Sequence, residues 1–244
     1  MIQLSVNVNK IATLRNARGG SEPSVVEFAR EAIAAGAHGI TVHPRPDERH
    51  IRRQDVFDLL PVVAPVEFNI EGYPDDRFLD IVRQVRPEQA TLVPDPPDVL
   101  TSNAGWDPAA HRSFLRDVIA QLQSWGARVS LFMETDLARL DAAADTGTDR
   151  IELYTGPYAE AFAAGQGEAS YAEYERAARH AVGLGLGINA GHDLNLANLA
   201  RMRDLPGLTE VSIGHALVCD ALRLGWRPAV AEYLRVLDPD QSSG

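Results

Sequence analysis

The sequence lacks the features that mark disulfide-rich, membrane-spanning and secreted proteins. Cys219 is its only cysteine, which excludes a disulfide framework and a cluster of thiolate metal ligands. No apolar run approaches the roughly 18 residues that a membrane-spanning helix needs. The first ten residues, MIQLSVNVNK, lack the basic and apolar regions of a secretory signal. These absences predict a cytoplasmic protein that does not enter a membrane.

Basic residues are scarce relative to acidic ones. The chain holds 23 Lys and Arg against 34 Asp and Glu, which gives a formal charge of -11. Nucleic acid is therefore not expected as a partner, because binding to its backbone needs a basic face. The 45% hydrophobic and 23% charged content is that of a globular protein. A length of 244 residues suits one large domain.

Eight short apolar runs recur along the chain, each followed by a loop and an amphipathic helical pattern. Each run is continuous rather than alternating, which is typical of strands covered on both faces. The predicted strands are Gln3–Val8, Gly39–Val42, Val66–Ile70, Ala90–Val93, Arg128–Met133, Arg150–Leu153, Gly187–Ala190 and Glu210–Ile213. In the first helical pattern Val25, Phe28 and Ala29 share one face, and Ser24 with Glu27 predicts a capping box.

This rhythm predicts an α/β fold, a single-domain (β/α)8 TIM barrel with extra helices. We expect the barrel over residues 1–238 and a flexible tail over 239–244. The alternative is an open doubly wound sheet, but its GxGxxG fingerprint is absent after the first strand, where the chain reads NVNKIATLRNARGG. Two long connections, Pro94–Asp107 and Thr155–Ser170, predict a lid and an inserted helix.

Titratable side chains stand where the predicted strands end, which is where barrels of this type carry their chemistry. Glu71 directly follows the buried run FNI, which favours a raised pKa and acid–base work, unless an arginine from a neighbouring loop pairs with it. Glu152 alternates with apolar neighbours and points into the barrel mouth, either for chemistry or for an interior salt bridge. His43 and His192 end two further strands, and His43 could equally be a histidine bonded only to backbone.

Other residues at these strand ends indicate anion binding. Gly191 and Gly214, in NAGH and IGHA, predict turns that bind phosphate through backbone N–H groups; the alternative is a tight turn without a ligand. A second anionic subsite is predicted from Arg15, Arg18, Arg45 and His50. Two phosphorylated substrates, or one bisphosphate, would suit this layout. The remaining basic residues of the second loop are expected to be solvated or to cap a helix: Arg49, Arg52 and Arg53.

Long motifs along nearly the whole chain resemble those of the pyridoxine 5'-phosphate synthases. In order they are VNVNKIATLRNARGG, GITVHPRPDERHI, FNIEG, TLVPD, VSLF, IELYTGPYA, INAGHDLN and SIGHA. The resemblance implies a (β/α)8 barrel that assembles into a homo-octamer and uses no metal or organic cofactor. It also implies condensation of 3-amino-2-oxopropyl phosphate with 1-deoxy-D-xylulose 5-phosphate, which gives pyridoxine 5'-phosphate, inorganic phosphate and water.

The resemblance also implies roles for particular residues. The proton acceptors would be His43 and Glu71, the proton donor His192, and the group that stabilises charged intermediates Glu152. The positions that hold the amino-oxopropyl phosphate are Asn7, Arg18, Asp193 through its backbone, Gly214 and His215. Those that hold the deoxyxylulose phosphate are Asn9, Lys10, Arg45, His50 and Thr101.

The chain departs from some members of that family at three places. Asn9 and Lys10 stand where some members have Asp and His, Asp193 stands where some have Gly, and Tyr154 replaces a histidine. Two other functions fit the residues. One is a metal-dependent barrel enzyme with His43, Glu71, Glu152 and His192 as ligands, although the HxH and HExxH spacings are absent. The other is a phosphosugar-binding barrel without catalysis.

Overall fold

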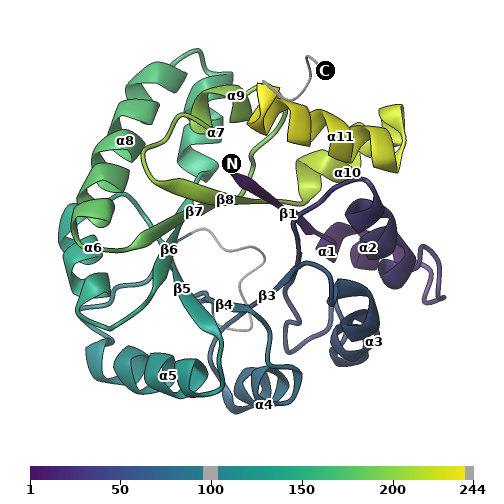
Figure 1. The fold of residues 1–244 in the computed structure, drawn as a ribbon, viewed down its shortest axis with the longest axis horizontal. Coiled ribbons are helices and arrows are strands. Elements are labelled where there is room, and N and C mark those ends of the chain that lie inside the picture. Colours follow the sequence, from purple (N-terminus) through teal and green to yellow (C-terminus); the bar gives the residue numbers. More distant parts are fainter. Residues whose placement is uncertain (96–103, 240–244) are drawn as a thin grey trace.

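The computed structural model describes residues 1–95 and 104–239 and shows a closed parallel barrel of eight strands surrounded by helices (Figure 1). Each strand pairs with its neighbours in chain order, and β8 closes the barrel against β1. The strands are β1 (Gln3–Asn7), β2 (Gly39–Val42), β3 (Glu67–Gly72), β4 (Gln89–Leu92), β5 (Arg128–Met133), β6 (Arg150–Tyr154), β7 (Gly187–Gly191) and β8 (Leu208–Ile213). The predicted (β/α)8 fold and all eight predicted strands are confirmed, with ends that move by one or two residues.

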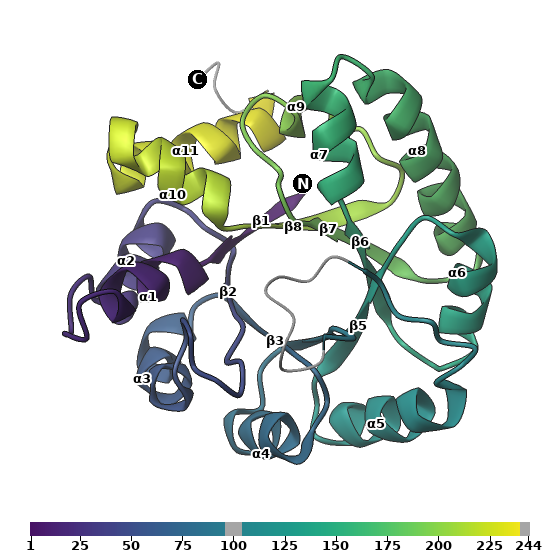
Figure 2. The ribbon, with the colours of Figure 1, turned by 180° about the vertical axis from the view of Figure 1, so that it is seen from behind.

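The helices form the outer ring, which both views show around the strands (Figures 1 and 2). They are α1 (Asn9–Asn16), α2 (Val25–Ala34), α3 (Arg53–Val63), α4 (Asp76–Val85), α5 (Arg112–Ser124), α6 (Leu137–Ala144), α7 (Gly156–Ala163), α8 (Gly167–Gly183), α9 (Leu199–Met202), α10 (His215–Leu224) and α11 (Trp226–Leu237). Helix α7 is the inserted helix predicted after β6. Most of the predicted lid, at 96–103, and all but one residue of the predicted tail lie outside the described residues. Among the described residues, no helix combines the length and the apolar character that crossing a bilayer requires.

Local signals place the helix ends. Ser24 caps α2, and its side-chain oxygen accepts the backbone N–H of Glu27 at 3.2 Å. Asp75 and Asp136 cap α4 and α6 in the same way. Gly126, just beyond α5, has a φ of +93°, a conformation that glycine adopts without steric cost. These ends fix where each strand begins, and so which of its side chains face inward.

The hydrophobic core lies between the barrel and the helix ring. Outward-facing strand residues such as Leu4, Ile40 and Ile151 are fully buried against apolar helix faces. The interior of the barrel, by contrast, is polar where most barrels carry branched aliphatic side chains. Ser5 and Thr41 share a hydrogen bond of 2.6 Å, and Asn69 links Thr41 to Thr91. Because these buried groups bond to one another, they form a fixed polar layer beneath the carboxyl ends of the strands.

Candidate active site

A cavity of about 690 Å³ opens at the carboxyl ends of the strands, the end at which barrels carry their chemistry. Of the thirteen predicted site residues that the structure describes, twelve line it and Arg18 does not. The twelve are Asn7, Asn9, Lys10, His43, Arg45, His50, Glu71, Glu152, His192, Asp193, Gly214 and His215. Residues separated by as much as 208 positions in the chain are thus brought to one site because every strand ends there.

His43 and Glu71 lie side by side at the ends of β2 and β3. The His43 Nδ1 atom is 3.9 Å from Glu71 Oε2, and both side chains are nearly buried. Burial is the main cause that lowers the pKa of His43 well below its usual value, and the nearby His50 and Arg45 add to it. The imidazole is therefore neutral at physiological pH, so one of its two nitrogens is unprotonated and can accept a proton.

Asn7 and Asn9 hold the backbone at His43 through a short chain of hydrogen bonds. Asn7 Oδ1 accepts the backbone N–H of Asn9 at 3.0 Å, and Asn9 Oδ1 accepts the backbone N–H of His43 at 2.9 Å. The two asparagines were predicted as substrate holders. The structure gives both oxygens a further task, which is to fix the end of β2 against the start of α1.

Two buried carboxyls face the cavity, and burial favours the neutral form of both. Burial raises the pKa of Glu71 to about 8, with smaller contributions from the negative charges of Asp95 and Glu210. Burial and the proximity of Glu71 raise the pKa of Glu152 well above its usual value. The raised pKa expected for Glu71 is confirmed. Glu152 Oε2 is buried and has no hydrogen-bond partner among residues 1–95 and 104–239, so this oxygen can form a hydrogen bond with a ligand.

Gly191 makes room for Glu152. A Cβ at Gly191 would lie 2.2 Å from Glu152 Oε1, a distance that no side chain could occupy. Gly191 was expected in a phosphate-binding turn, but it is not among the residues that line the cavity. Its role in this structure is to let the β6 carboxyl fit against β7.

Gly214 lies at the start of α10 and lines the cavity with the next two residues of that helix, His215 and Ala216. A Cβ at Gly214 would lie 3.1 Å from the Cβ of Asn7, which is tighter than ordinary contact. The glycine thus allows α10 to begin against β1, with its first backbone N–H groups at the cavity. Such a helix start favours an anion because its N–H groups lack partners within the helix.

Basic side chains of α1 and of the loop after β2 line the same cavity. Arg45 is buried, and its guanidinium lies 3.3 Å from the Asp95 carboxylate. His50 Nδ1 accepts the backbone N–H of Ile51 at 2.9 Å. Burial, with the charges of Arg45 and Lys10, lowers the pKa of His50 to about 4. His50 is therefore neutral, and its Nε2 carries the proton that it can donate into the cavity.

The structure changes the assignment of two arginines and agrees with that of a third. Arg49 was expected to be solvated, but it lines the cavity with its guanidinium 2.6 Å from Asp47. Arg15 was expected at an anionic subsite, but it is buried and binds Asp55 at 2.9 Å and the backbone oxygen of His50 at 3.2 Å. Arg15 thus fixes the loop that carries His50. Arg53 pairs with Asp80 on the surface, as expected.

Arg18 is exposed in the loop after α1 and does not line the cavity. Thr101 lies outside the described residues. Several cavity residues were not singled out from the sequence: Thr13, Val93, Phe132, Leu194, Ser212, Ile213 and Ala216. Strand alternation could have indicated Ser212 and Phe132, because each lies two residues from another inward-facing position.

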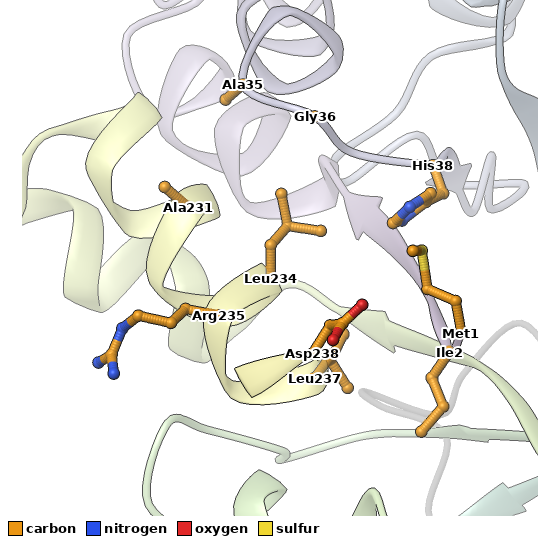
Figure 3. A pocket seen from close by; sticks show the side chains of 10 residues that line it. All are labelled: Met1, Ile2, Ala35, Gly36, His38, Ala231, Leu234, Arg235, Leu237 and Asp238. Atoms are coloured by element: carbon orange, nitrogen blue, oxygen red, sulfur yellow. The ribbon is translucent and has the colours of Figure 1, made fainter. Parts of the chain in front are cut away.

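A second cavity, of about 360 Å³, lies at the opposite end of the barrel between β1, the loop before β2, and α11 (Figure 3). Its lining is mostly apolar, with His38, Arg235 and Asp238 as its ionisable side chains. The His38 Nδ1 atom accepts the backbone N–H of Leu4 at 3.1 Å. Buried carboxyls gather at the first cavity and not here, so the first is the candidate active site. Within the described ranges, no group of three or more His, Cys, Asp or Glu side chains is arranged to hold a metal ion.

Solved structures with the same fold include phosphoribosylanthranilate isomerase from Thermotoga maritima, with a TM-score of 0.60, 12% identity, and 98% of this chain and 100% of that chain covered. Thiamine phosphate pyrophosphorylase from Pyrococcus furiosus gives a TM-score of 0.63 at 13% identity, with 98% and 96% covered. At these identities the likeness shows the fold alone.

Sequence relatives are much closer. The chain is 58% identical to the pyridoxine 5'-phosphate synthase of Porphyromonas gingivalis over 234 residues, which cover 96% of this chain and 98% of that protein. It is 54% identical to the pyridoxine 5'-phosphate synthase of Parabacteroides distasonis over 239 residues, covering 98% and 100%. The family model described as pyridoxal phosphate biosynthesis protein PdxJ matches residues 4–239. This chain therefore belongs to the PdxJ family.

Proposed function

We propose that this chain is a pyridoxine 5'-phosphate synthase. The reaction joins 3-amino-2-oxopropyl phosphate and 1-deoxy-D-xylulose 5-phosphate and yields pyridoxine 5'-phosphate, inorganic phosphate and water. One observation carries the proposal: a single cavity is lined by a neutral imidazole, two buried carboxyls, the start of α10 and the basic side chains of Lys10 and Arg45. These groups can position two phosphates and transfer several protons to and from the substrates.

The first step requires the amine of one substrate to attack the ketone of the other, which it can do only as a neutral amine. In this proposal His43 takes the proton from the ammonium group, because its buried imidazole is neutral before the substrate arrives. Its neighbour Glu71, whose pKa burial raises to about 8, is protonated at pH 7 before the substrate arrives. An ammonium beside Glu71 lowers the pKa of this carboxyl again, since an opposite charge favours the carboxylate. Substrate binding thus turns Glu71 into a proton acceptor.

In this proposal Glu152 stabilises the positive charge of a reaction intermediate. Burial favours the neutral form of its carboxyl, and one oxygen lacks a partner in the described part of the chain. An iminium carbon or nitrogen nearby favours the ionised form, which then stabilises that cation.

The two phosphates are assigned to different groups of residues in the cavity lining. The start of α10, with Gly214 and His215, takes the amino-oxopropyl phosphate. Lys10, Arg45 and His50 take the deoxyxylulose phosphate. Arg18 and Thr101 are kept in the proposal on the resemblance alone, and His192 is the proton donor for the later dehydrations.

The experiment that tests this function measures phosphate release and product absorbance with each substrate alone and with both together. The synthase requires both substrates for either signal. A binding barrel without catalysis would bind each phosphate in calorimetry and release none. A metal-dependent enzyme would lose activity after treatment with a chelator and regain it with a divalent metal, and metal analysis of the purified protein would find the ion.

We further propose that the chain acts in the cytoplasm as a homo-octamer, as the resemblance implies. Large apolar side chains on the adjacent helices α1 and α10 support self-association, because Leu14 is 53% exposed and Leu222 is 80% exposed. Light scattering on the eluting protein would measure the assembly directly. A monomer at micromolar concentration would contradict the octamer.

A further inference from the structure

The turn that carries His192 has an unusual backbone. His192 and Asp193 have φ values of +84° and +57°, so two successive residues that are not glycine adopt the left-handed conformation. This region is sterically unfavourable for side chains with a Cβ, and residues held there are commonly part of a functional site. Both side chains line the cavity.

Buried hydrogen bonds hold this turn. The hydroxyl of Thr155 donates to the backbone oxygens of Gly191, at 2.7 Å, and of His192. The Asn198 side chain donates to the backbone oxygen of Asp193 at 3.1 Å. Thr155 and Asn198 are fully buried, so the turn is set by the fold and not by its own preference.

The consequence is a contact between neighbouring side chains. In a strand, His192 and Asp193 would point to opposite faces. In this turn the Asp193 Oδ2 atom lies 2.8 Å from His192 Nδ1. The Tyr154 ring packs against the edge of the imidazole with 5.2 Å between ring centroids. The imidazole is thus held from two sides.

We propose that Asp193 is a positioning residue for His192, which it holds through Nδ1 so that Nε2 is the atom that exchanges a proton with substrate. This inference rests on the proposed function, in which His192 is the proton donor. A carboxylate on one ring nitrogen sets the tautomer of the imidazole and stabilises the imidazolium form. In this role the side chain of Asp193 contributes, beyond the backbone contact with phosphate that the resemblance implies.

The charges around the pair are consistent with this role. The hydrogen bond from His192 is the main cause that lowers the pKa of Asp193, and the proximity of His215 on α10 and Lys10 on α1 acts in the same direction. Tyr154 on β6 faces the pair, with the carboxylates of Glu134 and Glu160 beyond it. Asp193 therefore remains ionised, in a position where it can stabilise a neighbouring positive charge.

Two substitutions separate the parts of this role. Asp193→Asn keeps an oxygen that can accept the Nδ1 proton and tolerates the left-handed backbone, but it removes the charge. Asp193→Gly removes both and relieves the backbone. In Asp193→Asn we expect the basic limb of the kcat profile to move to lower pH by about half a unit, the scale of a partly exposed ion pair. In Asp193→Gly we expect kcat to fall about tenfold, the usual scale for removing a group that orients a functional histidine.

A matched control exists on the helix ring, where Asp141 Oδ1 lies 2.7 Å from His180 Nε2 at the surface. Asp141→Asn removes a pair of the same chemistry far from the cavity and should leave kcat and its pH profile unchanged. Melting curves of all three variants check that each is folded.

Nitrogen NMR of the ligand-free protein tests the same contact without any reaction. We expect neutral His192 to carry its proton on Nδ1 in the parent and in Asp193→Asn, and to lose this preference in Asp193→Gly. If the parent lacked the Nδ1–H tautomer, the positioning role would be wrong even with an active synthase. If both variants kept the parental kcat and pH profile and changed only KM, Asp193 would act as a substrate holder alone. An inactive parent would instead refute the proposed function, and the NMR result would still stand.

Discussion

The buried, neutral state of Glu71 makes a prediction that links stability to activity. The pKa of this carboxyl rises from 4.5 to about 8 in the fold, chiefly because burial disfavours the charged form. The unfolded chain gives up this proton near pH 4.5, whereas the folded chain keeps it until about pH 8. The free energy of unfolding is thus not reduced by this group below pH 4.5, and it falls as the pH rises from there toward 8.

The size of the effect follows from that interval. The interval from pH 4.5 to pH 7 spans roughly 2.5 pH units, and each unit lowers the free energy of unfolding by about 1.36 kcal/mol. At pH 7 the folded state is therefore about 3 kcal/mol less stable than it would be with a group that cannot ionise. Glu71→Gln replaces the neutral acid by an amide of nearly the same shape. At pH 7 the variant should therefore be about 3 kcal/mol more stable than the parent, a rise in Tm of roughly 6–12 °C for a chain of this length. Its kcat should fall at least about a hundredfold, because the amide cannot transfer a proton.

Denaturant titrations of parent and variant at pH 5, 6, 7 and 8, together with turnover at each pH, measure both effects. The gain in stability should be small at pH 5 and grow steadily toward pH 8. The matched control is Glu134→Gln, since Glu134 is partly exposed and pairs with Arg139 at 2.7 Å. Its effect should stay below about 1 kcal/mol at every pH. A stability difference for Glu71→Gln that did not change with pH would refute a neutral Glu71.

Three further substitutions test other parts of the site. His43→Asn should leave substrate binding in calorimetry largely unchanged and lower kcat at least about a hundredfold, and near-normal turnover would count against His43 as the base. Gly214→Ala should raise KM for the amino-oxopropyl phosphate about tenfold and change kcat less, because a Cβ there would lie 3.1 Å from Asn7 Cβ and shift the start of α10; an unchanged KM would remove α10 from the phosphate site. Thr155→Val should lower the free energy of unfolding by about 1–3 kcal/mol and lower kcat as well, since two backbone oxygens of the His192 turn lose their donor; unaltered kcat with lower stability would show that the turn needs no support from Thr155.

The strands and much of the site could be predicted because both depend on local sequence. Barrel strands covered on both faces appear as short apolar runs, and the polar residue that ends such a run stands at the active end of the barrel. His43 and Glu71 were found by this rule, and their contact at 3.9 Å follows from the pairing of β2 with β3.

The errors concern contacts between segments far apart in the chain. Arg15 and Arg49 were both expected in basic loops, but Arg15 lies in α1 and binds Asp55 in the first turn of α3. Arg49 reaches the cavity because the loop after β2 folds over it. Gly191 serves Glu152 through the pairing of β6 with β7. None of these relations leaves a signal in spacing or composition.

The most direct test of the proposed reaction is the stoichiometry of a chelator-treated reaction analysed by mass spectrometry. Purified protein mixed with 3-amino-2-oxopropyl phosphate and 1-deoxy-D-xylulose 5-phosphate should form pyridoxine 5'-phosphate and free phosphate in equal amounts, over many turnovers and without added metal. Free phosphate without pyridoxine 5'-phosphate, or no release of phosphate from the two substrates together, would contradict the proposal.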